Sequence, residues 1–147
     1  MKPRTRARSL ALQALYEIDL TGHPAEEVLA GRATDYDLDA PLEDFARRLV
    51  TSVLPLRKEL DNYISQHAPE WPIEQVSVID RNIIRMATWE FAVSGDTPIK
   101  VAINEAVELA KRYGSDSSPR FVNGVLGSLA ERKDEINMAL APKVQQD

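Results

Sequence analysis

Prolines stand at the head of five apolar segments of helical period, and this punctuation constrains the fold more than any other feature of the chain. The prolines are Pro24, Pro41, Pro72, Pro98 and Pro119. Proline suits the first turn of a helix because the backbone N–H that it lacks would have no helical partner there. Apolar residues then recur at spacings of three and four, and no stretch alternates for long as a strand does. The sequence therefore predicts an all-α fold.

The predicted helices are joined by short loops, which is typical of a bundle of antiparallel neighbours. They cover residues 4–21, 24–31, 42–67, 76–94, 98–113 and 118–133. Residues 32–41 form a polar loop, and residues 134–147 are expected to fray. Pro55 lies inside the third helix, where it removes a backbone hydrogen bond, so we expect a kink or a break there. Left-handed helix stops are expected at Gly22, Gly95 and Gly114.

The composition excludes several kinds of chemistry. The chain has no cysteine, which excludes disulfides, thiolate metal sites and cysteine nucleophiles. His23 and His67 stand in no metal-binding pattern, and no glycine motif for a phosphate or a dinucleotide is present. Glu105 and Glu108 lie three residues apart, but the Glu-x-x-His partner of a di-metal bundle site is missing. We therefore predict that the protein is not an enzyme and has no catalytic residues, no metal and no cofactor.

The apolar runs are too short for a membrane span, which needs about 20 residues. The basic N-terminus lacks the apolar core of a secretion signal. With 44% hydrophobic and 28% charged residues, the composition is that of a globular chain. We therefore expect a cytoplasmic protein with no membrane contact.

Charge is unevenly spread along the chain, which has 18 basic and 23 acidic residues and a formal net charge of -5. The first eight residues contain no acid and hold Lys2, Arg4, Arg6 and Arg8. Phosphate attraction is local at physiological salt, because charges more than about 8 Å apart are largely screened. A basic tip of this kind can therefore hold a short anionic strand even on an acidic protein. The alternative is a solvated N-terminus with incidental arginines.

The helix over 4–21 has more apolar surface than one core requires. One arc is formed by Leu10, Ala11, Ala14, Leu15 and Ile18. A second stripe of Leu12, Tyr16 and Leu20 lies on the other side, at spacings of four. Such a helix is either central in a bundle or in contact with a partner.

The helix over 118–133 has an unusual face opposite its core stripe. This face is made of Arg120, Asn123, Gly124 and Gly127. A glycine inside a helix costs about 1 kcal/mol relative to alanine, so we expect a helix or a ligand to approach the backbone closely there.

The start of this last helix is basic. Lys111, Arg112 and Arg120 surround a helix N-terminus, where unpaired N–H groups and the helix dipole favour an anion. Ser118 stands where its hydroxyl can cap those N–H groups. Phe121 can stack on a base, although it also fits a core position.

Residues 98–111 read PIKVAINEAVELAK, and residues 121–126 read FVNGVL. Three further segments are RAR at 6–8, LQALY at 12–16 and IRMA at 84–87. Together these segments closely resemble the NusB family, in the order and spacing of that family over residues 4–133.

The resemblance implies a single domain of two stacked three-helix bundles over residues 1–134. The N-terminal bundle would cover about 4–67 and the C-terminal bundle about 72–134, followed by a tail at 135–147. It also implies a transcription antitermination factor without catalytic activity. Such a factor binds the single-stranded boxA RNA of ribosomal RNA leaders together with NusE, a small-subunit ribosomal protein, and joins the antitermination complex of RNA polymerase.

With the resemblance, candidate residues fall on two surfaces. RNA binding is expected of Lys2, Arg4, Arg6, Arg8, Lys111, Arg112, Arg120, Phe121 and Asn123. The NusE-facing surface is expected at Leu12, Tyr16, Leu20, Asp80 and Ile84. Thr5 stands where relatives often have another arginine, which weakens the charge of the tip. Asp80 replaces a glutamate of some members, which shortens its reach by one methylene group.

Three alternatives remain open. The helical module also occurs fused to methyltransferases that act on ribosomal RNA, although this chain has no room for a cofactor domain. A structural protein could form a homodimer through the stripe of Leu12, Tyr16 and Leu20, and some relatives do self-associate. The third alternative is a generic helical bundle.

Overall fold

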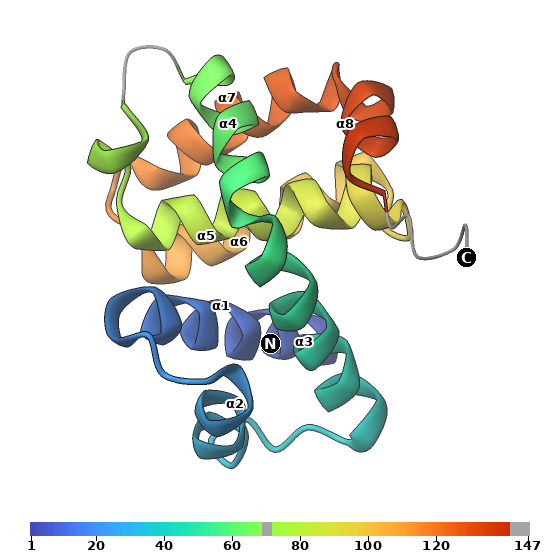
Figure 1. Ribbon diagram of the computed structural model, residues 1–147. Helices are drawn as coiled ribbons and strands as arrows, with labels where there is room; N and C mark the ends of the chain where they lie inside the picture. Colours follow the sequence, from blue (N-terminus) through green and yellow to red (C-terminus); the bar gives the residue numbers. More distant parts are fainter. Residues whose placement is uncertain (69–71, 142–147) are drawn as a thin grey trace. The chain divides into compact units, whose positions relative to one another are not determined.

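The computed structural model describes residues 1–68 and 72–141 (Figure 1). All regular secondary structure in these two stretches is helical, which confirms the all-α fold class. The chain forms two compact units, Met1–Pro55 and Leu56–Asp147. No helix in the described stretches is both long and apolar enough to cross a membrane.

The first unit consists of α1 (Pro3–Thr21), α2 (Ala25–Ala33) and α3 (Ala40–Val53), with α1 packed against the other two. Its core is apolar and fully buried, with Leu10, Leu15 and Leu49 at its centre. Pro3 occupies the first turn of α1, and Gly22 ends the helix with a left-handed φ of 75°. The stop at Gly22 is the one that the sequence predicted, whereas the start at Pro3 was not among the predicted proline signals.

Pro55 breaks the predicted helix over 42–67, as expected. α3 ends at Val53, a 3-10 turn covers Leu54–Leu56, and α4 (Arg57–His67) follows. The break is also where the two compact units meet along the chain. The expected boundary between bundles, near residues 67–72, therefore lies too late, because α4 packs on α5 and α7 of the second unit.

In the second unit, α5 (Val78–Thr88), α6 (Ile99–Tyr113) and α7 (Ser118–Ala130) pack against one another. α5 continues into a π-helical segment, Trp89–Ser94, which ends at Gly95 with a left-handed φ of 72°. Fully buried Ile83, Phe91 and Leu126 fill the core between these elements. A 3-10 turn at Ile73–Gln75 precedes α5.

Residues 134–140, which were expected to fray, lie in a further helix, α8 (Lys133–Leu140). The expectation was wrong because Ile136 is fully buried and anchors the helix. Asn137 adds two hydrogen bonds, from its Nδ2 to the carbonyl oxygens of Ala92 (3.0 Å) and Val93 (3.3 Å). α8 therefore packs on the π-helical segment and satisfies its carbonyls. Residues 142–147 of the predicted tail lie outside the described residues.

Two polar contacts tie α4 to other helices of the second unit. Arg85 Nε and Nη2 donate to the two carboxylate oxygens of Asp61, at 2.7 Å and 2.6 Å. At the end of α4, the Nδ1 of His67 is hydrogen-bonded to the hydroxyl of Ser128 on α7. Burial lowers the pKa of His67 below its usual 6.5, and the positive charge of Arg132 lowers it further.

Candidate nucleic-acid interface

Lys2 is the N-cap of α1, the three arginines of the tip lie on the first turns of that helix, and the first turn contains no acid. The guanidinium carbons of Arg4 and Arg8 lie 4.5 Å and 5.2 Å from the ring centroid of Phe45, on α3. The Nη1 of Arg6 donates to the backbone carbonyl of Tyr36 at 3.3 Å. The tip is therefore part of the folded first unit, with its arginines held by an aromatic ring and a carbonyl.

The four basic residues of the tip differ in how exposed their side chains are. Lys2 and Arg4 are exposed, and Arg6 is half-buried. Arg8 is only 3% exposed, so its guanidinium has no surface with which to meet RNA, and we remove it from the candidate interface. The remaining candidates at this end are Lys2, Arg4 and Arg6.

At the start of α7, Ser118 links the preceding loop to α5. The backbone N–H of Ser115 donates to Ser118 Oγ at 2.9 Å, and Ser118 Oγ donates to Asp80 Oδ2 at 3.0 Å. Ser118 was expected to cap α7, but its hydroxyl binds Ser115 and Asp80 instead, and Ser117 at the N-cap makes no capping hydrogen bond with its side chain. The direction of both hydrogen bonds is fixed, because a backbone N–H can only donate and the Ser118 hydroxyl that accepts from it then donates to the carboxylate.

Gly114 does not adopt the left-handed conformation that was expected of it, because its φ is -93°. Its role is to leave space. A Cβ at this position would lie 2.5 Å from Ser118 Oγ and 2.9 Å from the carbonyl oxygen of Ala110. The loop can therefore close on Ser118 only with glycine here.

A pocket of about 570 Å³ lies beside this loop. Its lining comprises Gln75, Val76, Ser77, Ile79, Asp80, Tyr113, Gly114, Ser115, Ser117, Arg120 and Phe121. Two aromatic rings and one guanidinium thus share a cavity large enough for a small ligand. Phe121 is half-buried, so it belongs to the pocket wall and is not sealed in the core.

The Oδ1 atom of Asp80 is buried and has no hydrogen-bond partner. Asp80 is 8% exposed and shares the pocket with Arg120 and Phe121, which are RNA candidates. It therefore belongs with these residues, and we remove it from the surface expected to face a protein partner.

Exposed polar residues continue from the pocket along α6 and α7. Lys111 and Arg112 are exposed at the end of α6, where Lys111 pairs with Glu108 at 3.4 Å. Arg120, Asn123, Gly124 and Gly127 form an exposed stripe on α7. Apart from the neighbouring residues and backbone of α7 itself, no described atom lies within 4 Å of a Cβ placed at either glycine, so no other described segment makes the close approach that was expected.

The second apolar stripe of α1 is only partly accessible. Leu20 is 57% exposed and Tyr16 is half-buried, whereas Leu12 is fully buried. Ile84, the candidate on α5, is also fully buried. A partner can therefore meet Tyr16 and Leu20, and we remove Leu12 and Ile84 from the candidate surface because neither side chain has area to offer.

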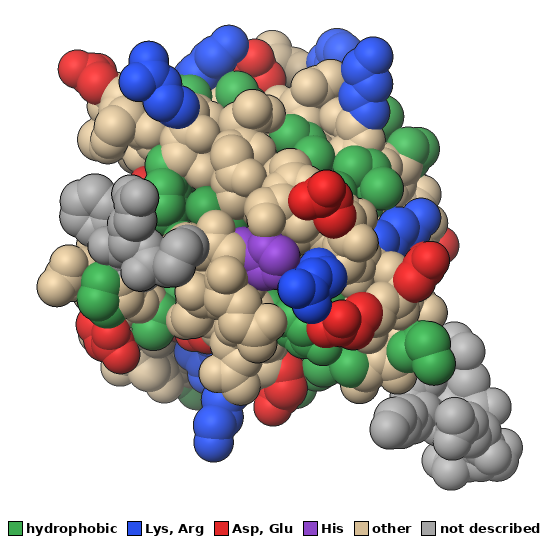
Figure 2. All heavy atoms as spheres, turned by 90° about the horizontal axis from the view of Figure 1, so that it is seen from above, with side chains coloured by type: hydrophobic (Ala, Val, Ile, Leu, Met, Phe, Trp, Pro, Cys, Tyr) green, Lys and Arg blue, Asp and Glu red, His purple; other side chains and the backbone are tan. Residues whose placement is uncertain are grey.

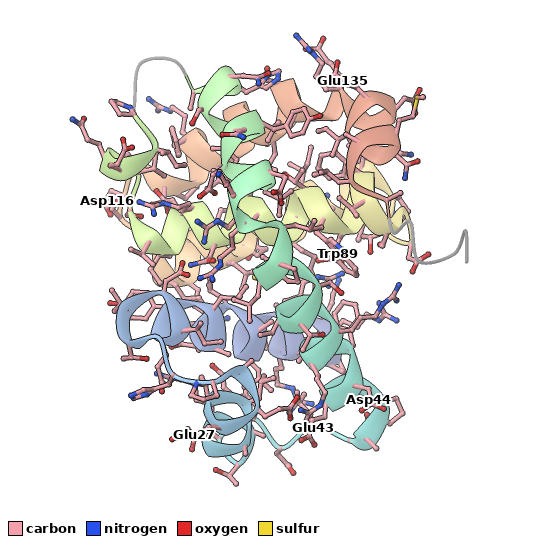
Figure 3. The ribbon with its side chains drawn as sticks, viewed as in Figure 1. Glu27, Glu43, Asp44, Trp89, Asp116 and Glu135 are labelled. Atoms are coloured by element: carbon pink, nitrogen blue, oxygen red, sulfur yellow. The ribbon has the colours of Figure 1, made fainter. Side chains whose placement is uncertain are left out.

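Acidic residues are also present in the first unit. Figure 3 shows Glu27 on α2 and Glu43 and Asp44 near the start of α3. On the face seen in Figure 2, acidic and basic side chains are interspersed among the described residues. In residues 1–68 and 72–141, no group of three or more His, Asp or Glu side chains is placed to hold a metal ion.

Two residues of the candidate interface were missed from the sequence. Phe45 lies at a core spacing in its helix, and no sequence signal places it against the arginines of another helix. Ser118 was interpreted as a local cap, although its hydroxyl donates a hydrogen bond to a buried carboxylate 38 residues away in the sequence. Both contacts are between segments distant in the chain, which periodicity does not detect.

Comparisons with known proteins agree with the fold and the resemblance. The model of the NusB family matches residues 5–131. The transcription antitermination protein NusB of Dehalococcoides mccartyi is 49% identical over 128 residues, which are 87% of this chain and 90% of that protein.

Two solved structures are also similar. T. maritima NusB is 35% identical with a TM-score of 0.77, and the match covers 97% of this chain and 96% of that one. A chain from the complex of the antitermination factors NusB and NusE with dsRNA is 25% identical with a TM-score of 0.78, covering 95% of this chain and 98% of that one.

Proposed function

This chain belongs to the NusB family of transcription antitermination proteins, and on that premise we propose that it binds boxA RNA together with NusE. The RNA would be the single-stranded boxA segment of ribosomal RNA leaders. The pair would act in the antitermination complex of RNA polymerase, so the protein would work in the cytoplasm. It acts as a non-catalytic adapter between an RNA and a protein.

The observation that best supports RNA binding is the pocket at the start of α7, where exposed Arg120 stands beside the rings of Tyr113 and Phe121. Unpaired RNA bases stack on aromatic rings, and arginine binds phosphates or stacks on bases. Lys111 and Arg112 extend the positive charge from this pocket along α6. A single strand rather than a duplex suits such a site, because only unpaired bases expose their faces.

The start of α1 supplies a second set of cations, with Lys2 and Arg4 exposed and Arg6 half-buried. It belongs to the first unit and the pocket to the second, and we propose that each contributes to RNA binding. Three or four phosphate contacts to a single strand predict a slope of log K against log salt of about -2 to -3.

For the protein partner, we propose the accessible part of the α1 stripe, Tyr16 and Leu20. A half-buried tyrosine beside an exposed leucine offers aromatic and apolar area without unfolding the helix. A partner that contacts the same RNA raises the effective concentration of both, so that two weak contacts become one specific complex. One of the similar structures is a complex of NusB and NusE with dsRNA, which supports a role for this chain with a protein partner and an RNA together.

A gel-shift titration tests the proposal. The RNAs are a single-stranded boxA oligonucleotide, a scrambled strand of equal length and a boxA duplex, each with and without the cognate NusE protein. We expect weak binding of boxA alone and a gain of at least tenfold with NusE that the scrambled strand does not show. Equal binding of the boxA and scrambled strands with NusE present would contradict the proposal.

Tyr16→Asp tests the partner surface separately. The charge should weaken NusE binding while the circular dichroism spectrum and melting temperature stay close to those of the wild type. Loss of the fold instead would mean that Tyr16 is a core residue. Light scattering of the same samples detects a homodimer, and a dimer that Tyr16→Asp dissociates would assign this stripe to self-association.

A further inference from the structure

We propose that Phe45 is a positioning residue for RNA binding, whose ring fixes the guanidinium of Arg4 where it meets an RNA phosphate. This inference rests on the proposed function. Phe45 lies on α3 and Arg4 in the first turn of α1, so the contact joins two helices of the first unit. The ring centroid is 4.5 Å from Arg4 Cζ, within the range of a cation–π interaction.

The ring holds the cation without neutralising it. Among residues 1–68 and 72–141, Arg4 has no carboxylate partner, and its contact is with the ring of Phe45. A carboxylate in the same place would orient the guanidinium but would also compete with a phosphate for it. An aromatic ring attracts the cation through its face, so the N–H donors at the guanidinium edge stay available for phosphate oxygens.

Neighbouring groups strengthen this arrangement. The first turn of α1 contains no acid, and its backbone N–H groups add partial positive charge. Arg8, 5.2 Å from the same ring and 3% exposed, packs on the buried side of this cluster. Arg4 is the exposed member, so the ring orders the one cation of the pair that RNA can reach.

Ordering Arg4 before RNA arrives has a physical consequence. An arginine side chain loses rotamer freedom when it is immobilised on a ligand, and a side chain that is already held loses less. Removing the ring should therefore weaken RNA binding even though Phe45 need not touch RNA. The expected size is about two- to fivefold in Kd, as for an exposed cation–π interaction.

A double-mutant cycle tests the inference with the full chain and a fluorescent boxA oligonucleotide. The variants are Phe45→Leu, Arg4→Ala and the double variant, measured by anisotropy. We expect Phe45→Leu to weaken binding about two- to fivefold in the wild type and to have no further effect in the Arg4→Ala background. Phe45→Tyr, which keeps the ring, should bind like the wild type.

Leu42→Ala on the same helix is the matched control for loosening of α3, because Leu42 is also half-buried but is not part of the arginine contact. It should leave RNA affinity unchanged. If Phe45→Leu does not fold, Arg4→Lys tests the same contact from the other side. It keeps the charge and removes the planar group, and should give the same two- to fivefold loss.

Three results would overturn the inference. Phe45→Leu could bind as tightly as the wild type, its effect could add fully to that of Arg4→Ala, or Leu42→Ala could weaken binding as much. Full additivity would mean that Phe45 contacts RNA directly. In each case boxA binding by the wild type would persist, whereas failure of the proposed function would abolish boxA-specific binding in every variant, including the wild type.

Discussion

The starts of α1 and α7 are both basic, but they hold their cations in different ways. At α1, the guanidinium groups of Arg4 and Arg8 pack on the ring of Phe45. Arg6 donates a hydrogen bond to a backbone carbonyl. At α7, Arg120 is exposed beside a pocket. The preceding loop is held by hydrogen bonds that link Ser115 to Ser118 and Ser118 to Asp80 on α5.

The difference shows two ways to prepare a surface for an anionic strand. At α1 the cations themselves are held in place. One of them, Arg8, is buried as a result, so its charge is not available to bind RNA. At α7 the hydrogen bonds order the loop beside the cavity, and the cation, Arg120, is exposed where it can meet a base or a phosphate. Substitutions should therefore affect stability most at α1 and RNA affinity most at α7.

The largest effect is expected from Arg8→Ala on stability. Removing a buried guanidinium and its aliphatic stem should lower the free energy of unfolding by about 2–3 kcal/mol, measured by urea denaturation. Arg4→Ala, at an exposed position against the same ring, is the control and should cost no more than about 1 kcal/mol. An equal loss of unfolding free energy in the two variants would contradict the idea that Arg8 supports the fold and Arg4 does not.

Arg120→Ala should have the next largest effect, on RNA affinity. Loss of a charged contact is expected to weaken boxA binding about tenfold, or about 1.4 kcal/mol. The slope of log K against log salt should become less negative by about 0.7, if the lost contact is to one phosphate. Its stability should stay within about 0.5 kcal/mol of the wild type, since the side chain is exposed. An unchanged salt slope would mean that Arg120 does not neutralise a phosphate.

Gly124→Ala sharpens the comparison along α7. A Cβ at this exposed position meets no atom within 4 Å, so alanine should stabilise the chain by about 0.5–1 kcal/mol. If a ligand backbone approaches this face, the same methyl group should weaken RNA or NusE binding. Stabilisation without any loss of binding would show that the glycine stripe is not part of an interface.

The smallest effect is expected at His67, the last residue of α4, whose ring is hydrogen-bonded to Ser128 near the end of α7. Because the pKa of His67 is lowered in the folded chain, the unfolded chain binds a proton more readily. Stability should therefore be complete above pH 6.5 and decline as the pH falls from there through the lower folded-state pKa. His67→Gln should lose this part of the pH dependence in urea denaturation between pH 7.5 and 5.5. Retention of the full dependence would assign it to other groups. His23→Gln, with an exposed ring, is the matched control.

Local signals in the sequence were enough for most helices and for the break at Pro55. Proline and glycine act through their own backbone, so their effect can be read from one position. α8 was missed because its anchor is the single buried Ile136, and one apolar residue makes no periodic pattern. The cations of the candidate site were found by charge alone. The ring of Phe45 and the acceptor on Asp80 were not, because each meets its partner only after helices have packed.

Gly114 has a consequence for how much variation this region can accept. Its neighbours Ser115, Asp116 and Ser117 are exposed and can change at little cost to the fold. At Gly114 even a methyl group would displace Ser118 and disturb the hydrogen bond that its hydroxyl donates to Asp80. Substitution at Gly114 should therefore be tolerated less well than substitution at the three exposed positions that follow it.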